Sequence, residues 1–181
     1  MRRTLAIFGG SFNPPHVAHQ LACLYVLETQ PVDHLLCMPA YRHPFDKALA
    51  PFADRVAMCR LLVAPLGGRA SVSTLEEEVD DGRTLVLVEA LRAREPDATL
   101  RLVIGADILR ECDKWWRWAD LERLAPPIVL GRHGFPGPDG VELPEVSSTE
   151  IRARLARGDA VDGLVPRSII QYLETKGLYA S

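Results

Sequence analysis

Two histidines stand three residues apart near the start of the chain, just after a pair of glycines. The segment reads Gly9-Gly10-Ser11-Phe12-Asn13-Pro14-Pro15-His16-Val17-Ala18-His19. Residues at this spacing share one face of a helix, so both imidazoles can reach the same ligand. Imidazole N–H groups, free backbone N–H groups at a helix N-terminus and the positive end of the helix dipole all favour anions. The segment therefore predicts a phosphate site, and the expected ligand is a nucleotide.

Apolar patterning predicts the elements that position these histidines. Residues 5–8 form a short apolar run that indicates a buried strand. Gly9 and Gly10 let the backbone leave that strand with torsions or close approaches that a side chain would forbid. A helix is expected over about residues 14–28, because the two prolines of the segment suit a helix cap and first turn.

Helical spacing divides that expected helix into two faces. The apolar stripe is expected at Val17, Leu21 and Leu24. The other face, open to a ligand, is expected to carry His16, His19, Gln20 and Cys23. Two other readings stay open: a histidine in a first turn can be a cap or a solvated group, and His16, His19 and Cys23 can be read as zinc ligands, although no paired-cysteine motif supplies a fourth.

Two familiar phosphate-loop patterns are missing from the chain. It contains no G-x-x-x-x-G-K-[ST] sequence, and no G-x-G-x-x-G follows the first strand. The P-loop ATPase and dinucleotide-dependent dehydrogenase classes therefore lose support.

Three further segments carry polar or aromatic groups that also have purely structural interpretations. Asp107 stands before an apolar pair and can cap a short helix. Ser147 and Glu150 have the spacing of a capping box, before a helix that ends near Gly158. Three clustered tryptophans are ordinarily a sign of packing, and they are Trp115, Trp116 and Trp118.

Strand and helix patterns alternate along the whole chain. Strands are expected at residues 5–8, 34–38, 70–73, 100–104 and 128–130, and the clearest helices between them at 52–64 and 85–94. This alternation predicts an α/β fold, a Rossmann-like doubly wound parallel sheet of about five strands with helices on both faces. Ligands of such sheets bind beyond the carboxyl ends of the strands, where the winding reverses. Residues 132–145, rich in glycine and proline, are expected to form a loop.

Composition limits the classes that fit. With 181 residues, 48% of them apolar, the chain can bury one good core, so residues 1–181 are expected to form a single domain. A net charge of -3 gives no basic field for nucleic acid. The first apolar run is too short for an export signal or a membrane span, which indicates a cytoplasmic protein with no membrane partner. The scattered cysteines are expected to be reduced, and they are Cys23, Cys37, Cys59 and Cys112.

Ordered motifs resemble a known family along nearly the whole chain. The histidine segment resembles the GxFxPxHxxH signature of the nucleotidyltransferase superfamily, and the chain as a whole is similar to the bacterial nicotinate mononucleotide adenylyltransferases. The further matching segments are Ile104-Gly105-Ala106-Asp107, Lys114-Trp115-Trp116, Ser147-Ser148-Thr149-Glu150-Ile151-Arg152 and the closing stretch from Val165-Pro166 to Tyr179.

The resemblance implies transfer of an adenylyl group from ATP to nicotinate mononucleotide, giving deamido-NAD and pyrophosphate, in NAD biosynthesis. The catalytic groups that it implies are His16, His19 and Arg152. The ATP-binding residues that it implies are Gly9, Gly10, Ser11, Phe12, His16, His19, Lys47, Gly105, Asp107, Ser148, Thr149 and Arg152. Mg²⁺ is expected to accompany ATP, held by phosphate oxygens and water and by no protein ligand.

The resemblance also implies a site for the pyridine nucleotide. Trp115 matches the position that stacks on the pyridine ring, and the backbone N–H of Trp116 can donate to the nicotinate carboxylate. Thr84 matches a position near that carboxylate, although it can equally cap the next helix.

Two positions depart from the family pattern, and several alternatives remain open. Many members carry Pro-Pro-His-Lys where this chain has a longer loop, so Arg42, His43 and Lys47 compete for the role of a cation over the triphosphate. Asn13 replaces an Asp of many relatives. The alternatives are phosphopantetheine adenylyltransferase, a cytidylyltransferase, a non-catalytic nucleotide sensor and a zinc-dependent hydrolase. Assembly into a homo-oligomer and acceptance of the amide nucleotide are both open.

Overall fold

The fold is built on one parallel sheet in a computed structural model that describes residues 2–42, 49–132 and 134–180. Within these residues the sheet has six strands in the order β3-β2-β1-β4-β5-β6, and each neighbouring pair is parallel. The strands are β1 (Thr4–Gly10), β2 (His34–Pro39), β3 (Ala70–Val72), β4 (Thr99–Gly105), β5 (Pro127–Arg132) and β6 (Glu142–Leu143). The expected doubly wound α/β sheet is confirmed, with six strands where about five were predicted.

The sixth strand lies inside the segment that was expected to be a loop. β6 pairs with the end of β5, Gly131 opposite Glu142 and Arg132 opposite Leu143. A two-residue strand is too short to leave an alternating pattern in the sequence. The pairing depends on close backbone approach, because a Cβ on Gly131 would collide with the Val141 carbonyl.

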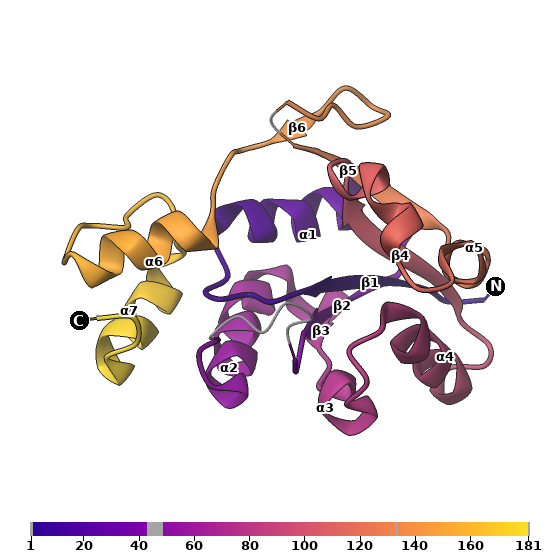
Figure 1. Ribbon diagram of the computed structural model, residues 1–181, viewed down its shortest axis with the longest axis horizontal. Coiled ribbons are helices and arrows are strands. Elements are labelled where there is room, and N and C mark those ends of the chain that lie inside the picture. The colour runs from indigo at the N-terminus through magenta and orange to yellow at the C-terminus, as the bar shows by residue number, and fades with distance from the viewer. Residues whose placement is uncertain (1, 43–48, 133, 181) are drawn as a thin grey trace.

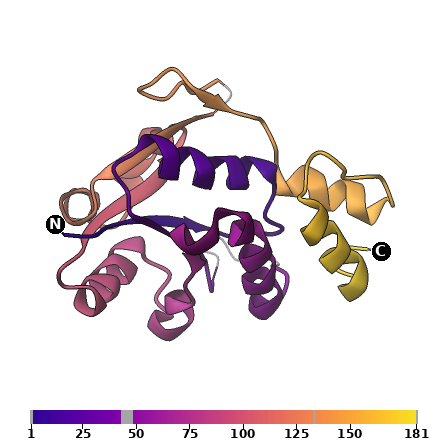
Figure 2. The same cartoon turned by 180° about the vertical axis from the view of Figure 1, so that it is seen from behind.

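Helices cover both faces of the sheet, and Figures 1 and 2 show α1 and α4 on opposite sides of β1. The α-helices are α1 (Val17–Thr29), α2 (Phe52–Val63), α3 (Leu75–Val79), α4 (Thr84–Arg94), α5 (Trp118–Leu124), α6 (Ser148–Ala156) and α7 (Arg167–Lys176). Short 3-10 helices occupy Ala64–Arg69, Ile108–Arg110 and Cys112–Lys114. The two clearest predicted helices therefore agree with α2 and α4 to within a residue.

Alternate side chains of β1 enter two separate cores, as the strand pleat requires. Ala6 packs on the side of α1 and α2, whereas Leu5 and Ile7 pack on the side of α4 and α5. A third cluster joins α6 and α7 to α1 and α2 through Ala18, Met58, Leu62, Ile151, Ile169 and Leu173. This packing fixes α6 near the start of α1, at the end of the molecule away from the N-terminus (Figure 1).

The expected apolar stripe of α1 was wrong, and so was the open face assigned to Cys23. The helix begins at Val17 with His16 as its N-cap, so the two prolines precede it instead of forming its first turn. Leu21 and Leu24 are 42% and 43% exposed. The buried side chains are Ala18, Ala22, Cys23, Val26 and Leu27. The small buried residues let the helix lie close to the sheet. A prediction that ranks residues by hydrophobicity places leucine rather than alanine on the buried face, and it therefore chose the wrong side of the helix.

The cysteines are free thiols, and Cys23, Cys37 and Cys59 are buried whereas Cys112 is partly exposed. Burial raises the pKa of the Cys23 thiol to about 12, because the thiolate would be poorly solvated there. Across the part of the chain that the structure describes, no helix has the length and apolar character needed to cross a bilayer.

Candidate functional site

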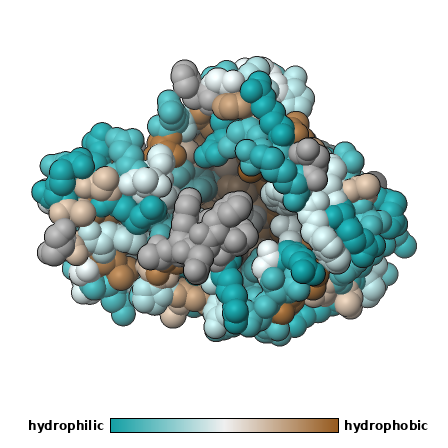
Figure 3. Space-filling model, viewed as in Figure 1, coloured by the Kyte–Doolittle hydropathy of each residue, from teal (hydrophilic) through white to brown (hydrophobic). Residues whose placement is uncertain are grey.

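A cavity of about 410 Å³ opens at the carboxyl ends of β1 and β4. The winding of the sheet reverses there, since β1 has β2 on one side and β4 on the other. Figure 3 shows a hollow in this face, with a hydrophobic floor and a hydrophilic rim. The polar and glycine residues of the lining are Gly9, Gly10, Ser11, His16, His19, Arg42, Glu76, Gly82, Thr84, Gly105 and Arg132.

The two histidines of the sequence motif lie together in this lining. Their rings stack with centroids 3.6 Å apart. The backbone N–H of His16 donates to Nδ1 of His19 over 3.2 Å, which leaves the proton of a neutral His19 ring on Nε2. Nδ1 of His16 is buried and has no hydrogen-bond partner among the described residues.

Both imidazoles are neutral near pH 7 in this structure. Burial lowers the pKa of His16 to about 4, and the positive charge of Arg132 acts in the same direction. Burial, His16 and Arg132 together hold the pKa of His19 well below its ordinary value. The site therefore presents N–H donors to a ligand and becomes more cationic only when an anion arrives to raise these pKa values.

Phe12 fixes the orientation of the His19 ring. Its own ring is buried and meets the His19 imidazole edge-on, with centroids 4.9 Å apart. The φ angle of Phe12 is 46°, in the left-handed region that a residue with a side chain occupies at a cost of about 1–2 kcal/mol. Backbone strain of this kind is typical of functional turns, where the surroundings hold the chain in place.

Asp107 occupies the N-cap position of the short 3-10 helix Ile108–Arg110, as one interpretation expected, but its side chain does not cap it. Its side chain makes no cap hydrogen bond and instead forms an ion pair with Arg132, with 3.0 Å between Oδ2 and Nη1. Gly105 makes room for this pair, because a Cβ there would collide with both side chains. Oδ1 of Asp107 is buried without a partner in the described part of the chain, so it remains an acceptor.

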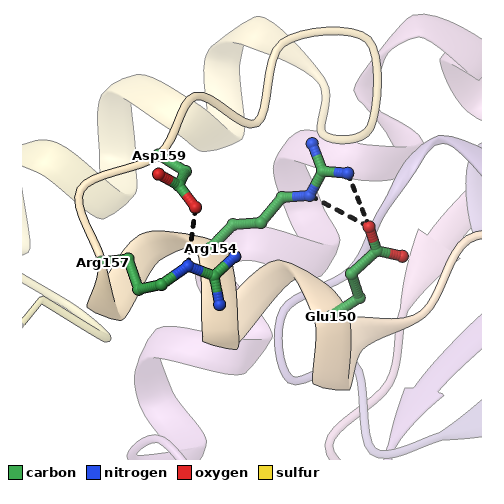
Figure 4. A network of polar contacts seen from close by, with 4 residues as sticks. All are labelled: Glu150, Arg154, Arg157 and Asp159. Carbon is green, nitrogen blue, oxygen red and sulfur yellow. Dashed lines mark hydrogen bonds and ion pairs between the residues drawn. The ribbon is translucent and has the colours of Figure 1, made fainter.

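The start of α6 carries only half of the expected capping box. The Ser147 hydroxyl accepts from the Thr149 backbone N–H over 3.2 Å, as a cap should. Glu150 turns away and binds Arg154 instead, with 2.7 Å between Oε1 and Nη2 (Figure 4). The first turn of α6 therefore keeps backbone N–H groups that the Glu150 side chain does not occupy.

The histidine segment and the start of α6 lie in contact, although more than 130 residues separate them in sequence. Nη1 of Arg152 donates to the Asn13 carbonyl over 2.7 Å, and Nη2 lies 3.3 Å from the Thr149 hydroxyl. The Ser148 hydroxyl donates to the Pro14 carbonyl over 2.9 Å. The residues predicted as a second phosphate clamp thus lie against the turn that leads to His16.

The aromatic cluster divides between the cavity and the surface. Trp115 lines the cavity together with Thr84, and it also packs edge-on against Trp118 at 5.8 Å between centroids. Trp116 is 45% exposed, and its ring lies against the guanidinium of Arg83. Thr84 is the first residue of α4, one after its N-cap.

The divergent loop is described only at its start. Arg42 lines the cavity and forms an ion pair with Asp80, with 2.5 Å between Nε and Oδ1. His43 and Lys47 lie outside the described residues.

Sequence reasoning missed three charged side chains at the site. Arg132 stands at the end of β5 and was taken only as the start of a loop. Glu76 lines the cavity, and burial raises the pKa of its carboxyl. Arg55 is 1% exposed and donates to the carbonyls of Ser11, Ala40 and Ala50. An arginine on a helix normally indicates an exposed face, so only tertiary structure reveals it.

Among the residues described, no group of three or more His, Cys, Asp or Glu side chains is arranged to hold a metal ion. Cys23, weighed as a zinc ligand with the two histidines, is buried in the core beneath α1.

Comparisons with known proteins identify the family of the chain. The model of the cytidylyltransferase-like family matches residues 7–154. A probable nicotinate-nucleotide adenylyltransferase of Anaeromyxobacter sp. (strain K) is 50% identical, over 98% of this chain and 97% of that protein. A relative of the same name from Myxococcus xanthus (strain DK1622) is 46% identical, over 97% of this chain and 94% of its own length.

Solved structures share the fold. Plasmodium falciparum nicotinic acid mononucleotide adenylyltransferase complexed with NaAD superposes with a TM-score of 0.84, covering 98% of this chain and 97% of that one. The two sequences are 18% identical, so this likeness concerns the arrangement of helices and strands.

Proposed function

The chain belongs to the cytidylyltransferase-like family, and we propose that it transfers the adenylyl group of ATP to nicotinate mononucleotide, giving deamido-NAD and pyrophosphate in NAD biosynthesis. One observation carries the proposal beyond the likeness to curated relatives. A single cavity is lined both by the stacked imidazoles of His16 and His19 and by the Trp115 indole. Two imidazole donors suit phosphates, and a flat aromatic suits a pyridine ring.

The reaction requires positioning and charge stabilisation more than acid–base chemistry. A 5'-phosphate oxygen of nicotinate mononucleotide attacks the α-phosphorus of ATP in line, and the bond from that phosphorus to the bridging oxygen breaks. The attacking phosphate is already ionised, so no side chain must remove its proton. The protein must hold two polyanions together and stabilise the charge that passes to the departing pyrophosphate.

The proposed catalytic residues are His16, His19 and Arg152. The imidazoles donate N–H groups to the triphosphate, and its negative charge raises their pKa values so that they also supply positive charge. The Arg152 guanidinium keeps its charge and can bind phosphate oxygens in a bidentate way. Lys47 is proposed as a further cation, and Arg132 joins the set because its charge already acts on both histidines.

The remaining site residues are proposed to bind the two substrates. For ATP these are the backbone of Gly9, Gly10, Ser11 and Phe12, the turn at Gly105, the Asp107 carboxylate and the Ser148 and Thr149 hydroxyls. The free Oδ1 of Asp107 suits a ribose or adenine donor. For nicotinate mononucleotide, Trp115 stacks on the pyridine, while Thr84 and the Trp116 backbone N–H approach the carboxylate.

Mg²⁺ is proposed to enter with ATP, held by phosphate oxygens and water. When bound, it neutralises part of the triphosphate charge. We also propose that residues 1–181 form one nucleotidyltransferase domain. The protein is proposed to be cytoplasmic and to have no nucleic-acid or membrane partner.

A pyrophosphate-release assay tests the function directly. The purified protein is given ATP and Mg²⁺ with nicotinate mononucleotide, its amide or phosphopantetheine in parallel, and CTP replaces ATP in a fourth reaction. Release with ATP and the acid mononucleotide, and formation of deamido-NAD, are expected. Turnover only in the reaction with phosphopantetheine, or only in the reaction with CTP, would instead identify a sister transferase. Tight ATP binding without pyrophosphate release would identify a nucleotide sensor.

A further inference from the structure

The turn between β1 and α1 is held by a side chain from the last residues of the described chain. The Tyr179 hydroxyl donates to Oδ1 of Asn13 over 2.6 Å. The same oxygen accepts the backbone N–H of Ala50 over 3.0 Å, just before α2. Asn13 itself is 2% exposed. One buried amide oxygen therefore connects the C-terminal segment, the phosphate-facing turn and the start of α2.

Tyr179 reaches this oxygen at a conformational cost. Its φ angle is 64°, in the left-handed region that disfavours residues with side chains. Its ring packs against the third core cluster, beneath α6 and α7. Burial raises the pKa of its hydroxyl, so the group remains a hydrogen-bond donor across the physiological pH range. Backbone strain of this kind persists where the surrounding contacts hold a residue in place.

The hydrogen bond between Tyr179 and Asn13 is connected to the His19 ring through Phe12. Phe12 precedes Asn13, adopts its own left-handed conformation and packs edge-on against the His19 ring. A shift of Asn13 would therefore move Phe12 and change the direction in which His19 points. Displacements of about 1 Å at groups that contact a transition state can cost on the order of a hundredfold in rate.

We propose that Tyr179 is a positioning residue of the nucleotide site: through Asn13 it fixes the turn that aims the imidazoles at the triphosphate. The catalytic consequence rests on the proposed function, but the control of the turn does not. Tyr179 closes the segment that resembled the adenylyltransferases, and no role follows from that resemblance.

A second tyrosine of the same region provides a matched control. The Tyr172 hydroxyl, on α7, donates to Oδ1 of Asp54 over 2.7 Å. This bond also ties the C-terminal region to α2, but Asp54 lies outside the turn and outside the cavity lining. Tyr179→Phe and Tyr172→Phe each remove one hydroxyl and one hydrogen bond, so a merely structural role predicts similar effects.

The test measures hydrogen exchange and kinetics on both variants. In the protein without substrates, Tyr179→Phe is expected to speed exchange of the backbone amides of residues 11–17, and Tyr172→Phe is not. With ATP, Mg²⁺ and nicotinate mononucleotide, Tyr179→Phe should lower kcat by about fivefold or more, the loss of one ordinary hydrogen bond. The KM for ATP should change less than kcat.

Clear outcomes would overturn the proposal. Unchanged exchange in residues 11–17 of Tyr179→Phe, or equal losses of kcat in the two variants, would show that the contact is only structural. If the wild-type protein released no pyrophosphate with nicotinate mononucleotide, the proposed function would fail, while the exchange data would still decide the role of Tyr179. In an Asn13→Ala background, Tyr179→Phe should have no further effect, and additive effects would contradict coupling through Asn13.

Discussion

The histidine pair shows how residue chemistry depends on burial. The stacked rings near Arg132 are neutral without ligand. In the proposed reaction they act first as N–H donors and add positive charge only while a phosphate is bound, because an anion raises their pKa values.

His19→Ala should therefore reduce turnover far more than stability. Removing one donor aimed at a transition-state charge typically costs on the order of a hundredfold or more in rate, whereas His19 belongs to none of the three core clusters. Pyrophosphate release and thermal melting measure the two effects. His34→Gln is the control, because His34 binds the Ser71 hydroxyl away from the cavity lining. Wild-type kcat in His19→Ala would refute the phosphate role.

Trp115→Ala is expected to act on the acceptor substrate. Loss of an aromatic stack worth about 0.5–1.5 kcal/mol should raise the KM for nicotinate mononucleotide by roughly two- to tenfold and leave the KM for ATP nearly unchanged. Trp116→Ala should leave both near wild type, because the proposal uses only its backbone N–H and its ring is exposed. A defect confined to ATP in Trp115→Ala would reverse the assignment.

At the scale of single residues, the sequence identified groups whose chemistry is visible in their type and spacing. His16, His19, Ser148 and Arg152 belong to motifs; the two histidines line the cavity, whereas Ser148 and Arg152 contact the turn before His16 and are not part of the cavity lining. Arg132 and Arg55 belong to no motif in the sequence. Their contacts depend on which strand ends and which backbone carbonyls the fold brings near them. The face assigned to Cys23 was wrong for a similar reason, since burial is decided by the sheet beneath the helix.

At the scale of elements, the ends of β4 and β5 form one unit through the Asp107–Arg132 pair. The ion pair requires glycine at position 105, because a Cβ there would collide with the side chains of Asp107 and Arg132. The alternation of strands and helices was readable from short, mostly apolar runs. The two-residue β6 and the exact start of α1 were not, because pairing and capping contacts determine them.

Gly105→Ala should disrupt this unit. Forcing a Cβ between two paired side chains typically costs about 1–3 kcal/mol of stability, and displacement of Asp107 should raise the KM for ATP. Gly68→Ala serves as the control, since a Cβ there would meet nothing within 4 Å. Denaturant unfolding and steady-state kinetics would measure both effects, and a Gly105→Ala protein with wild-type stability and KM would show that the pair has no such role.

At the scale of the whole molecule, the doubly wound order places the turns after β1 and β4 side by side at the carboxyl ends of the strands. The third core cluster then carries α6 to the turn before α1. The general fold could be predicted from alternation, but the docking of α6 and of Tyr179 on that turn could not, because it rests on contacts between residues far apart in sequence.

Buried neutral histidines also link whole-molecule stability to pH. An unfolded His16 takes up a proton near pH 6.5, whereas the folded one does so near pH 4. Between these values the unfolded state binds more protons, so the free energy of unfolding should fall as pH drops from about 6.5 to about 4, by roughly 3 kcal/mol from this group. Denaturant unfolding of wild type and His16→Asn should show a flatter profile in the variant. Parallel profiles would contradict the assignment.

The most direct measurement of the central claim is a crystal structure with a non-hydrolysable ATP analogue and nicotinate mononucleotide. The account predicts phosphate oxygens about 3 Å from the ring nitrogens of His16 and His19, with the pyridine against Trp115. A nucleotide bound outside the cavity, with both imidazoles still stacked and without phosphate contact, would contradict it.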